Sequence, residues 1–367
     1  NDVSNTNIRT YTINPFYPKS FSFFSKSTLK SKLAFKFWKN GLKILYKGVI
    51  FDRTLFWKTA LHKKIKSILR NENIGYIIVT IPPFLLAKRV LELKHSFPNV
   101  KFVIDYRDPW TENKSFHGFK NIKKKTLEFE KKIEKKAILS ADLVLSTNQQ
   151  MNLWNQLKNV EKNKFKVLEN GFDEDEIQMY NLAKKGNKPT SLLLAGSIYD
   201  GLDYIINPFI EAICSIEKID PQFSKNFEFI FIGTSSDKLE RQVKDKNIVS
   251  IKILPRLSRL ELNTFYNKAE FFMMFSAIDH GFAFNTKFYE YLAYKKPIIH
   301  FGPEGDVTDF LRKNKIGLGV CAKSLNKEFN NVLEQIKENK LKFNKDFNIE
   351  QFEVKNLTKK LISLLEN

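Results

Sequence analysis

The carboxyl-terminal half of the chain alternates short apolar runs with stretches of helical periodicity. The apolar runs, rich in Ile, Val, Leu and Phe, predict six strands at residues 192–195, 227–232, 249–254, 271–275, 297–300 and 317–320. Because these runs are nearly continuous in apolar residues, we expect a parallel sheet with helices on both faces. In such a sheet the ligand lies at the carboxyl ends of the strands.

The amino-terminal half shows the same rhythm from Gly75 onward. Its pattern predicts strands at 76–80, 101–105, 143–146 and 165–168, and helices at 83–95, at 120–139 and from Gln149. The fold class is therefore α/β, with two Rossmann-like domains at residues 1–182 and 183–349 and a linker at 183–189. An amphipathic helix follows at 352–365. No strand with a glycine-rich turn opens the first domain, so we expect its N-terminal unit to be incomplete.

Composition agrees with two folded domains. The chain has 367 residues, of which 43% are hydrophobic and 14% aromatic, enough for two full cores. The two cysteines, Cys214 and Cys321, are isolated, which favours a reducing compartment and gives neither a disulfide framework nor a metal site. No apolar run approaches the roughly 20 residues that span a bilayer, and no signal peptide is visible. The sequence predicts a cytoplasmic protein.

The net charge of +21 is concentrated near the amino terminus. Residues 1–66 hold 14 Lys and Arg against two Asp, a net charge of +12, and aromatic residues alternate with the lysines from residue 14 onward. Such a basic aromatic arm is typical of segments that lie on an anionic membrane surface. A solvated lysine face over a phenylalanine-rich core is the alternative. No recognition motif accompanies the charge, so we do not expect a nucleic acid partner.

Residues 282–303, FAFNTKFYEYLAYKKPIIHFGP, contain the clearest candidate site. Asn285 or Thr286 can cap a helix, and the free amides of a helix N-terminus bind phosphate. Lys287 adds a positive charge there, and Glu290 lies one turn further on. A nucleotide satisfies both groups, with its diphosphate at the helix tip and its ribose hydroxyls at Glu290. The alternative is an ordinary helix start with no ligand.

The segment NTKFYEYLAYKKPII resembles (P/N)-T-K-x-(F/Y)-E-Y-L-A-x-G-K-P-(I/V) of nucleotide-sugar-dependent glycosyltransferases of family 4. The resemblance implies the GT-B fold, in which two Rossmann-like domains face a central cleft, and a C-terminal helix, here 350–367, that packs back on the first domain. Family members carry a second glutamate eight positions before Glu290, where this chain has Phe282. In this chain we expect Asp279 and His280 to make the contacts to the sugar instead.

The turn GSIY at residues 196–199 resembles the family's G-(T/S)-(I/L)-Y turn. There the backbone amides approach the donor diphosphate, which makes Gly196 and Ser197 candidate donor-binding residues. Many family members carry Arg or Lys in or after this turn, whereas this chain has Ser197 and Asp200. The positive charge must then come from Lys287, with Arg256 or Arg259 as further candidates.

In the first domain, DYRDPW at residues 105–110 resembles the D-(F/Y)-R-D-P-W segment of the same subgroup, and TIPP at 80–83 resembles an S-x-P-P loop that lines the cleft. We expect acceptor-side roles for Thr80, Pro82, Asp105 and Trp110. Arg107 and Asp108 join Lys287 as candidate catalytic residues, because carboxylates beside an arginine can bind a hydroxyl or act as a base. The alternative is an Arg–Asp pair that pins a loop.

No metal or other cofactor is expected. Asp173-Glu174-Asp175 resembles the metal-binding D-x-D of a different glycosyltransferase fold, but it follows Asn170-Gly171 and opens a helix, where acidic residues offset the helix dipole. The sequence has no His, Cys and carboxylate cluster with metal spacing. The leaving diphosphate would be stabilised by helix amides and Lys287.

These observations predict a metal-independent glycosyltransferase of the hexosyltransferase type, with a retaining mechanism implied by the resemblance. The donor would be a nucleotide-diphosphate sugar and the acceptor a glycan or lipid-linked precursor of cell-surface polysaccharide, at the inner face of the plasma membrane. One alternative is a nucleotide-sugar epimerase or hydrolase of the same fold, which would turn over the donor without an acceptor. The other is a non-enzymatic basic module that binds polyanions or anionic membrane.

Overall fold

The computed structural model describes residues 8–13, 29–49, 53–112, 119, 121–148, 162–179, 188–198, 201–234 and 237–366. Its internal contacts divide the chain into two compact units, Asn1–Val167 and Leu168–Asn367. The boundary predicted between residues 182 and 183, and most of the predicted linker, lie outside the described residues, as does the helix predicted from Gln149.

Unit 1 contains a parallel sheet in the order β1-β2-β3-β4. Its strands are Tyr76–Ile81, Lys101–Tyr106, Leu143–Ser146 and Phe165–Val167. All four were predicted to within a residue. Thr80 of β1 lies opposite Asp105 of β2, so the carboxyl ends of these two strands meet at one edge of the sheet.

The described helices of unit 1 are α2 (Leu29–Leu45), α3 (Lys58–Asn71), α4 (Leu85–Leu91) and α5 (Lys124–Ser140), with 3₁₀ turns at Arg53–Phe56, Lys94–Ser96 and Lys162–Lys164. The helix predicted at 83–95 is split into α4 and the 3₁₀ turn at Lys94–Ser96. It begins at Leu85, two residues after the Pro82-Pro83 pair. The helix predicted at 120–139 begins later, at Lys124.

Unit 2 contains a six-stranded parallel sheet in the order β10-β9-β8-β5-β6-β7. Its strands are β5 Thr190–Ala195, β6 Phe227–Ile232, β7 Ile251–Leu254, β8 Phe271–Phe275, β9 Ile298–Phe301 and β10 Gly317–Val320. The strand predicted from Val249 starts at Ile251, because Val249 is 68% exposed although it is apolar. Chain order reverses between β5 and β8, and ligands bind at such a switch point in α/β sheets.

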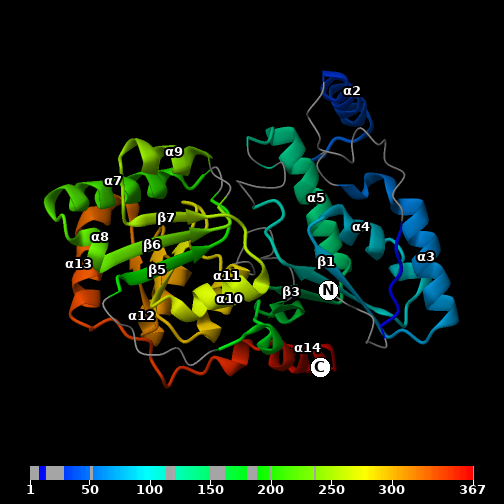
Figure 1. Ribbon diagram of the computed structural model, residues 1–367. Helices are drawn as coiled ribbons and strands as arrows, with labels where there is room; N and C mark the ends of the chain where they lie inside the picture. Colours follow the sequence, from blue (N-terminus) through cyan, green and yellow to red (C-terminus); the bar gives the residue numbers. More distant parts are fainter. Residues whose placement is uncertain are drawn as a thin grey trace. The chain divides into compact units, whose positions relative to one another are not determined.

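Helices cover both faces of the unit 2 sheet (Figure 1). The described helices of unit 2 are α7 Asp203–Ile219, α8 Phe223–Asn226, α9 Asp237–Asp245, α10 Arg259–Lys268, α11 Thr286–Ala293, α12 Asp306–Asn314, α13 Leu325–Lys337 and, outside these two layers, α14 Val354–Glu366. On the α7 and α13 face, the buried ring of Phe209 meets rings of β6, β8 and β9 and Phe329. Helices α10 to α12 cover the other face. This core fixes the strand ends that carry the candidate site.

The tail helix α14 lies in unit 2, where Lys360 Nζ is 2.7 Å from Glu169 Oε2. Just before α14, Glu353 forms an isolated parallel bridge with Phe172. The packing of the tail helix on the first domain stays a prediction. In the part of the chain that is described, no helix combines the length and the apolar character needed to cross a bilayer.

Candidate donor site

The N-terminus of α11 follows β8 and is built as the sequence predicts. Asn285 is the N-cap, and its Oδ1 accepts a hydrogen bond from the Phe288 amide at 2.9 Å. Buried side chains such as Phe288 and Leu292 fix the helix against the core. At the N1 and N2 positions the amides of Thr286 and Lys287 have no acceptor inside the helix. None of the described residues supplies one, so both can bind an anion.

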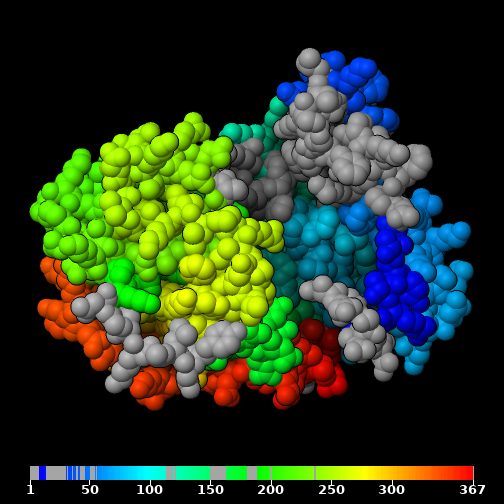
Figure 2. All heavy atoms as spheres, in the orientation of Figure 1, coloured from blue at the N-terminus to red at the C-terminus, as the bar shows by residue number. Residues whose placement is uncertain are grey.

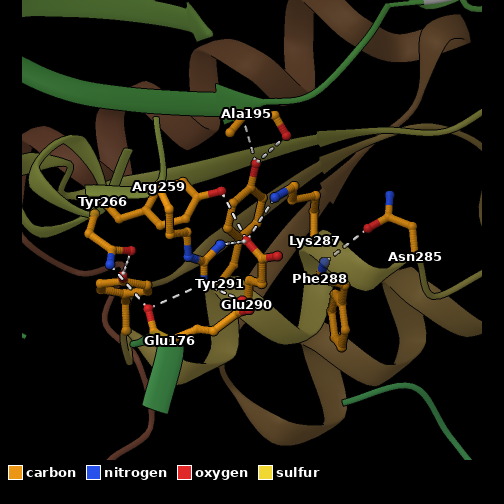
Figure 3. A network of polar contacts seen from close by, with 11 residues as sticks. Glu176, Ala195, Arg259, Tyr266, Asn285, Lys287, Phe288, Glu290 and Tyr291 are labelled. Atoms are coloured by element: carbon orange, nitrogen blue, oxygen red, sulfur yellow. Dashed lines mark hydrogen bonds and ion pairs between the residues drawn. The ribbon is translucent and has the colours of Figure 1, made fainter. Parts of the chain in front are cut away.

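Glu290 is the centre of a polar network beside this helix tip (Figure 3). Its Oε2 accepts hydrogen bonds from Lys287 Nζ at 2.8 Å, Arg259 Nη1 at 3.2 Å and Tyr266 Oη at 3.2 Å. Its Oε1 has no donor among the described residues. The two cations offset the carboxylate, so the negative charge of Glu290 is compatible with a phosphate at the helix tip.

Tyr291 connects α11 to the turn after β5. Its hydroxyl accepts a hydrogen bond from the Ala195 amide at 2.8 Å, immediately before Gly196. Gly196 has a φ of +148°, and a Cβ placed there would meet nothing within 4 Å. The glycine is therefore required by its backbone conformation and faces open space. Ser197 follows it, while Tyr199 and Asp200 lie outside the described residues.

Asp279 and His280 lie in the loop between β8 and α11. His280 Nδ1 is 3.2 Å from Asp279 Oδ1, and the imidazole packs near the Phe282 ring. The loop is tied to α12 through Gly281, whose carbonyl accepts a hydrogen bond from the Val307 amide. Both predicted donor residues thus belong to the loop that leads into the α11 N-terminus.

Arg259 belongs to the network around Glu290, and the sequence identified it only as an alternative to Arg256. It is the first residue of α10, where Ser258 and Glu261 form a capping box. Arg256, the predicted donor residue, is exposed in the preceding loop, and no ion pair joins it to a described residue. Tyr266 was missed altogether, because nothing in the local sequence shows that it faces Glu290.

At the carboxyl edge of the unit 1 sheet, Asp105 joins two predicted residues. Its Oδ2 accepts hydrogen bonds from Thr80 Oγ1 at 3.0 Å and Arg107 Nε at 2.9 Å. Its Oδ1 is buried and has no donor among the described residues, which is rare for a buried carboxylate oxygen. Pro82 follows β1, and Asp108 lies partly buried in the loop after β2.

Trp110 does not have the predicted acceptor-side role. Its side chain is fully buried, its Nε1 donates to Glu130 Oε2 at 3.0 Å, and its ring stacks on Phe84 with centroids 5.3 Å apart. A ring without solvent access cannot touch an acceptor. Trp110 instead anchors the loop after β2 to α5, because a buried indole N–H needs a partner.

No group of three or more His, Cys, Asp or Glu side chains is placed to hold a metal ion within the described ranges. The Asp173-Glu174-Asp175 segment forms the start of a 3₁₀ turn, Glu174–Glu176. Asp173 caps this turn by accepting a hydrogen bond from the Asp175 amide at 3.1 Å. The segment therefore begins a short 3₁₀ turn and not the predicted helix, and the absence of a metal there stays a prediction.

His300 lies at the carboxyl end of β9 and is fully buried, with Nε2 2.9 Å from Ser276 Oγ. Burial lowers the pKa of His300 from 6.5 to about 4. The folded state therefore keeps this ring neutral, while the unfolded state binds a proton below pH 6.5, so the stability linked to His300 is lost as pH falls from 6.5 toward 4.

We expect the unfolding free energy of the wild type to fall by about 2 kcal/mol more than that of His300→Gln between about pH 7.5 and about pH 5. Urea unfolding at both pH values measures this difference. Equal losses in the two proteins would show that His300 is not the group responsible.

No protein-family model matches this sequence, and no curated protein matches it. Solved structures do. The chain is similar to a glycosyltransferase from Rickettsia africae ESF-5, with 17% identity, a TM-score of 0.59 and coverage of 83% of this chain and 79% of that one.

Two further structures resemble the chain. Anabaena Alr3699/HepE in complex with UDP and glucose has 12% identity, a TM-score of 0.56 and coverage of 83% and 80%. A putative UDP-N-acetylglucosamine 2-epimerase from Listeria monocytogenes has 12% identity, a TM-score of 0.53 and coverage of 85% and 79%. At these identities the likeness establishes the fold alone: two parallel-sheet Rossmann-like units, the architecture of the GT-B glycosyltransferases.

Proposed function

We propose that this protein is a glycosyltransferase that moves a sugar from a nucleotide-diphosphate sugar to a glycan or lipid-linked acceptor. The observation that carries the proposal is the α11 N-terminus, where two free amides, a lysine and a glutamate with one open oxygen lie within one turn of helix. The likeness to glycosyltransferase structures supports it, as does the UDP and glucose bound by one of them.

In this proposal the diphosphate binds the backbone amides of Thr286 and Lys287. When the nucleotide-sugar binds, Lys287 Nζ turns from Glu290 to the diphosphate. The open Gly196 turn gives the diphosphate room, and Glu290 Oε1 accepts a ribose hydroxyl. Ser197, Arg256, Asp279 and His280 remain candidates for further donor contacts. The helix amides and the lysine stabilise the leaving diphosphate without a metal, because fixed dipoles and charges favour the negative charge that develops there.

The acceptor hydroxyl is proposed to bind at the carboxyl edge of the unit 1 sheet. Asp105 Oδ1 can accept a hydrogen bond from this hydroxyl, while Thr80 and Arg107 donate hydrogen bonds to Asp105 Oδ2. Pro82 borders the same edge, and Asp108 follows Arg107 as a second candidate carboxylate. The bond between the anomeric carbon and the diphosphate oxygen breaks, and the electron pair leaves with the diphosphate. The acceptor oxygen forms the new glycosidic bond on the same face while its proton passes to Asp105 Oδ1, so the configuration is retained.

A nucleotide-sugar epimerase is the second candidate, supported by the similarity to the Listeria structure. The two reactions differ in their need for an acceptor. Incubating the protein with labelled UDP-, GDP- and ADP-sugars, with and without a bacterial membrane lipid extract, separates them. Transfer of label to the lipid fraction only when extract is present supports the glycosyltransferase. Donor conversion without extract favours the epimerase.

Helix α2 supports a location at the inner face of an anionic membrane. It has no acidic residue, and its exposed lysines, Lys30, Lys32 and Lys36, lie beside exposed apolar side chains. Leu33, Phe37 and Trp38 are 66%, 74% and 39% exposed. Part of α2, in blue, lies at the surface in Figure 2. Apolar rings beside lysines match the interface between acyl chains and headgroups.

Replacing Leu33, Phe37 and Trp38 by serine is expected to weaken binding to phosphatidylglycerol-containing vesicles by at least about tenfold, because each buried side chain contributes more than about 1 kcal/mol. Sedimentation with vesicles measures the change. The matched control replaces three exposed apolar residues of unit 2, Ile219, Val249 and Leu260, and should bind like the wild type. Unchanged binding of the α2 variant would remove this helix from the membrane contact.

A further inference from the structure

The Glu290 carboxylate is oriented by residues from outside its own helix. Lys287 is on α11, but Arg259 and Tyr266 are both on α10, and all three donate to the same oxygen, Oε2. A carboxylate with three donors on one oxygen cannot rotate without losing hydrogen bonds. Oε1 is therefore held in one place as the remaining acceptor (Figure 3).

Arg259 is itself held at both ends of its guanidinium. Nη1 binds Glu290 Oε2, while Nη2 lies 3.4 Å from both the carbonyl oxygen and Oε2 of Glu176. The capping box of Ser258 and Glu261 fixes the backbone from which Arg259 projects. A planar fork that spans two carboxylates is pre-organised in a way that a lysine is not.

Tyr266 is the third hydrogen-bond donor to Oε2, and its side chain is also fixed by its surroundings. Its side chain is fully buried, and its ring meets those of Phe272, Tyr291 and Tyr294 at 5.1 to 5.7 Å. Burial raises the pKa of its hydroxyl, so the group remains a hydrogen-bond donor at physiological pH.

A lysine at the helix tip cannot serve Glu290 and a diphosphate equally well. When Lys287 turns to the diphosphate, Glu290 still has Arg259 and Tyr266 as donors. Without them the carboxylate would compete with the diphosphate for the lysine and lose its orientation.

We infer that Arg259, assisted by Tyr266, is a positioning residue that fixes Glu290 Oε1 to read the ribose hydroxyls of the nucleotide. The inference rests on the proposed function and adds to it a specificity: the site should distinguish nucleotides by their sugar hydroxyls through a residue that touches neither the sugar nor the phosphate.

The test compares a nucleoside diphosphate with its 2′,3′-dideoxy counterpart by calorimetry, using whichever of UDP, GDP and ADP the wild type binds. The wild type should prefer the ribonucleotide by about tenfold or more, the usual effect of a hydrogen bond to a charged group. In Arg259→Met this preference should fall by about three- to tenfold, and in Arg259→Lys it should stay reduced, because an ammonium cannot span both carboxylates. Arg312→Met, at an arginine exposed on α12, is the control and should keep the preference.

Tyr266→Phe removes only the hydroxyl and should reduce the preference with little change in fold, which circular dichroism checks for every variant. If Arg259→Met weakens both nucleotides equally, Arg259 binds the phosphate or only stabilises the fold, and the inference is wrong. A wild type that binds both nucleotides equally also overturns it while leaving the donor site intact. A wild type that binds no nucleotide overturns the proposed function itself.

Discussion

Lys287→Met is expected to weaken the binding of a nucleoside diphosphate by about 10- to 150-fold. A hydrogen bond to a charged group contributes about 1.5–3 kcal/mol, and each 1.4 kcal/mol is tenfold in affinity. In the structure Lys287 Nζ is paired with Glu290 and about one third exposed, so it can exchange this partner for a diphosphate without leaving the helix tip. Calorimetric titration of wild type and variant measures the loss.

The control is Lys313→Met, which removes an exposed lysine from α12 and changes the net charge by the same amount. If both variants lose affinity equally, the effect comes from the overall positive field, and if neither does, Lys287 does not bind the diphosphate. Raised salt should weaken the Lys287 contribution, because partly exposed charges are screened.

Trp110→Ala is expected to lower the unfolding free energy of the protein by about 3–5 kcal/mol, the usual cost of truncating a buried aromatic side chain. The substitution removes the stacking on Phe84 and leaves Glu130 Oε2 without the indole donor. Glu130 is 2% exposed, and its other oxygen accepts from Tyr46 Oη and the Val49 amide. A buried carboxylate that loses a donor adds its desolvation cost to the cavity.

Trp38→Ala is the matched control, since this tryptophan is 39% exposed on α2. It should change the unfolding free energy by less than about 1 kcal/mol, as surface substitutions do. Urea unfolding followed by circular dichroism compares the two. A loss for Trp110→Ala no larger than for Trp38→Ala would return Trp110 to the acceptor side as a candidate contact.

The strands and the α11 cap were predictable because their causes are local. Continuous apolar runs such as 271–275 specify buried parallel strands, and an asparagine before an apolar helix specifies an N-cap. Val249 was assigned to a strand by the same reasoning and lies outside it, because an apolar side chain at a strand start can face solvent at little cost.

The contacts that complete the candidate site are tertiary and could not be read from the sequence. Arg259 and Glu290 are 31 positions apart, and only the packing of α10 beside α11 brings them together. The sequence offered Arg256 and Arg259 as equivalent loop cations, and the capping box that begins α10 at Arg259 separates them. The acceptor-side role predicted for Trp110 conflicts with its burial for a related reason: a motif shows which residue is present but not whether its ring is buried.

The central claim is that the α11 N-terminus is a nucleotide-diphosphate site. The most direct measurement is calorimetric titration of the wild type and Glu290→Ala with UDP, GDP, ADP and dTDP. The claim predicts that one nucleotide binds with a micromolar dissociation constant and that the variant binds it more weakly. A folded wild-type protein that binds none of the four would contradict the claim, and a basic module that binds polyanions would then be the better account.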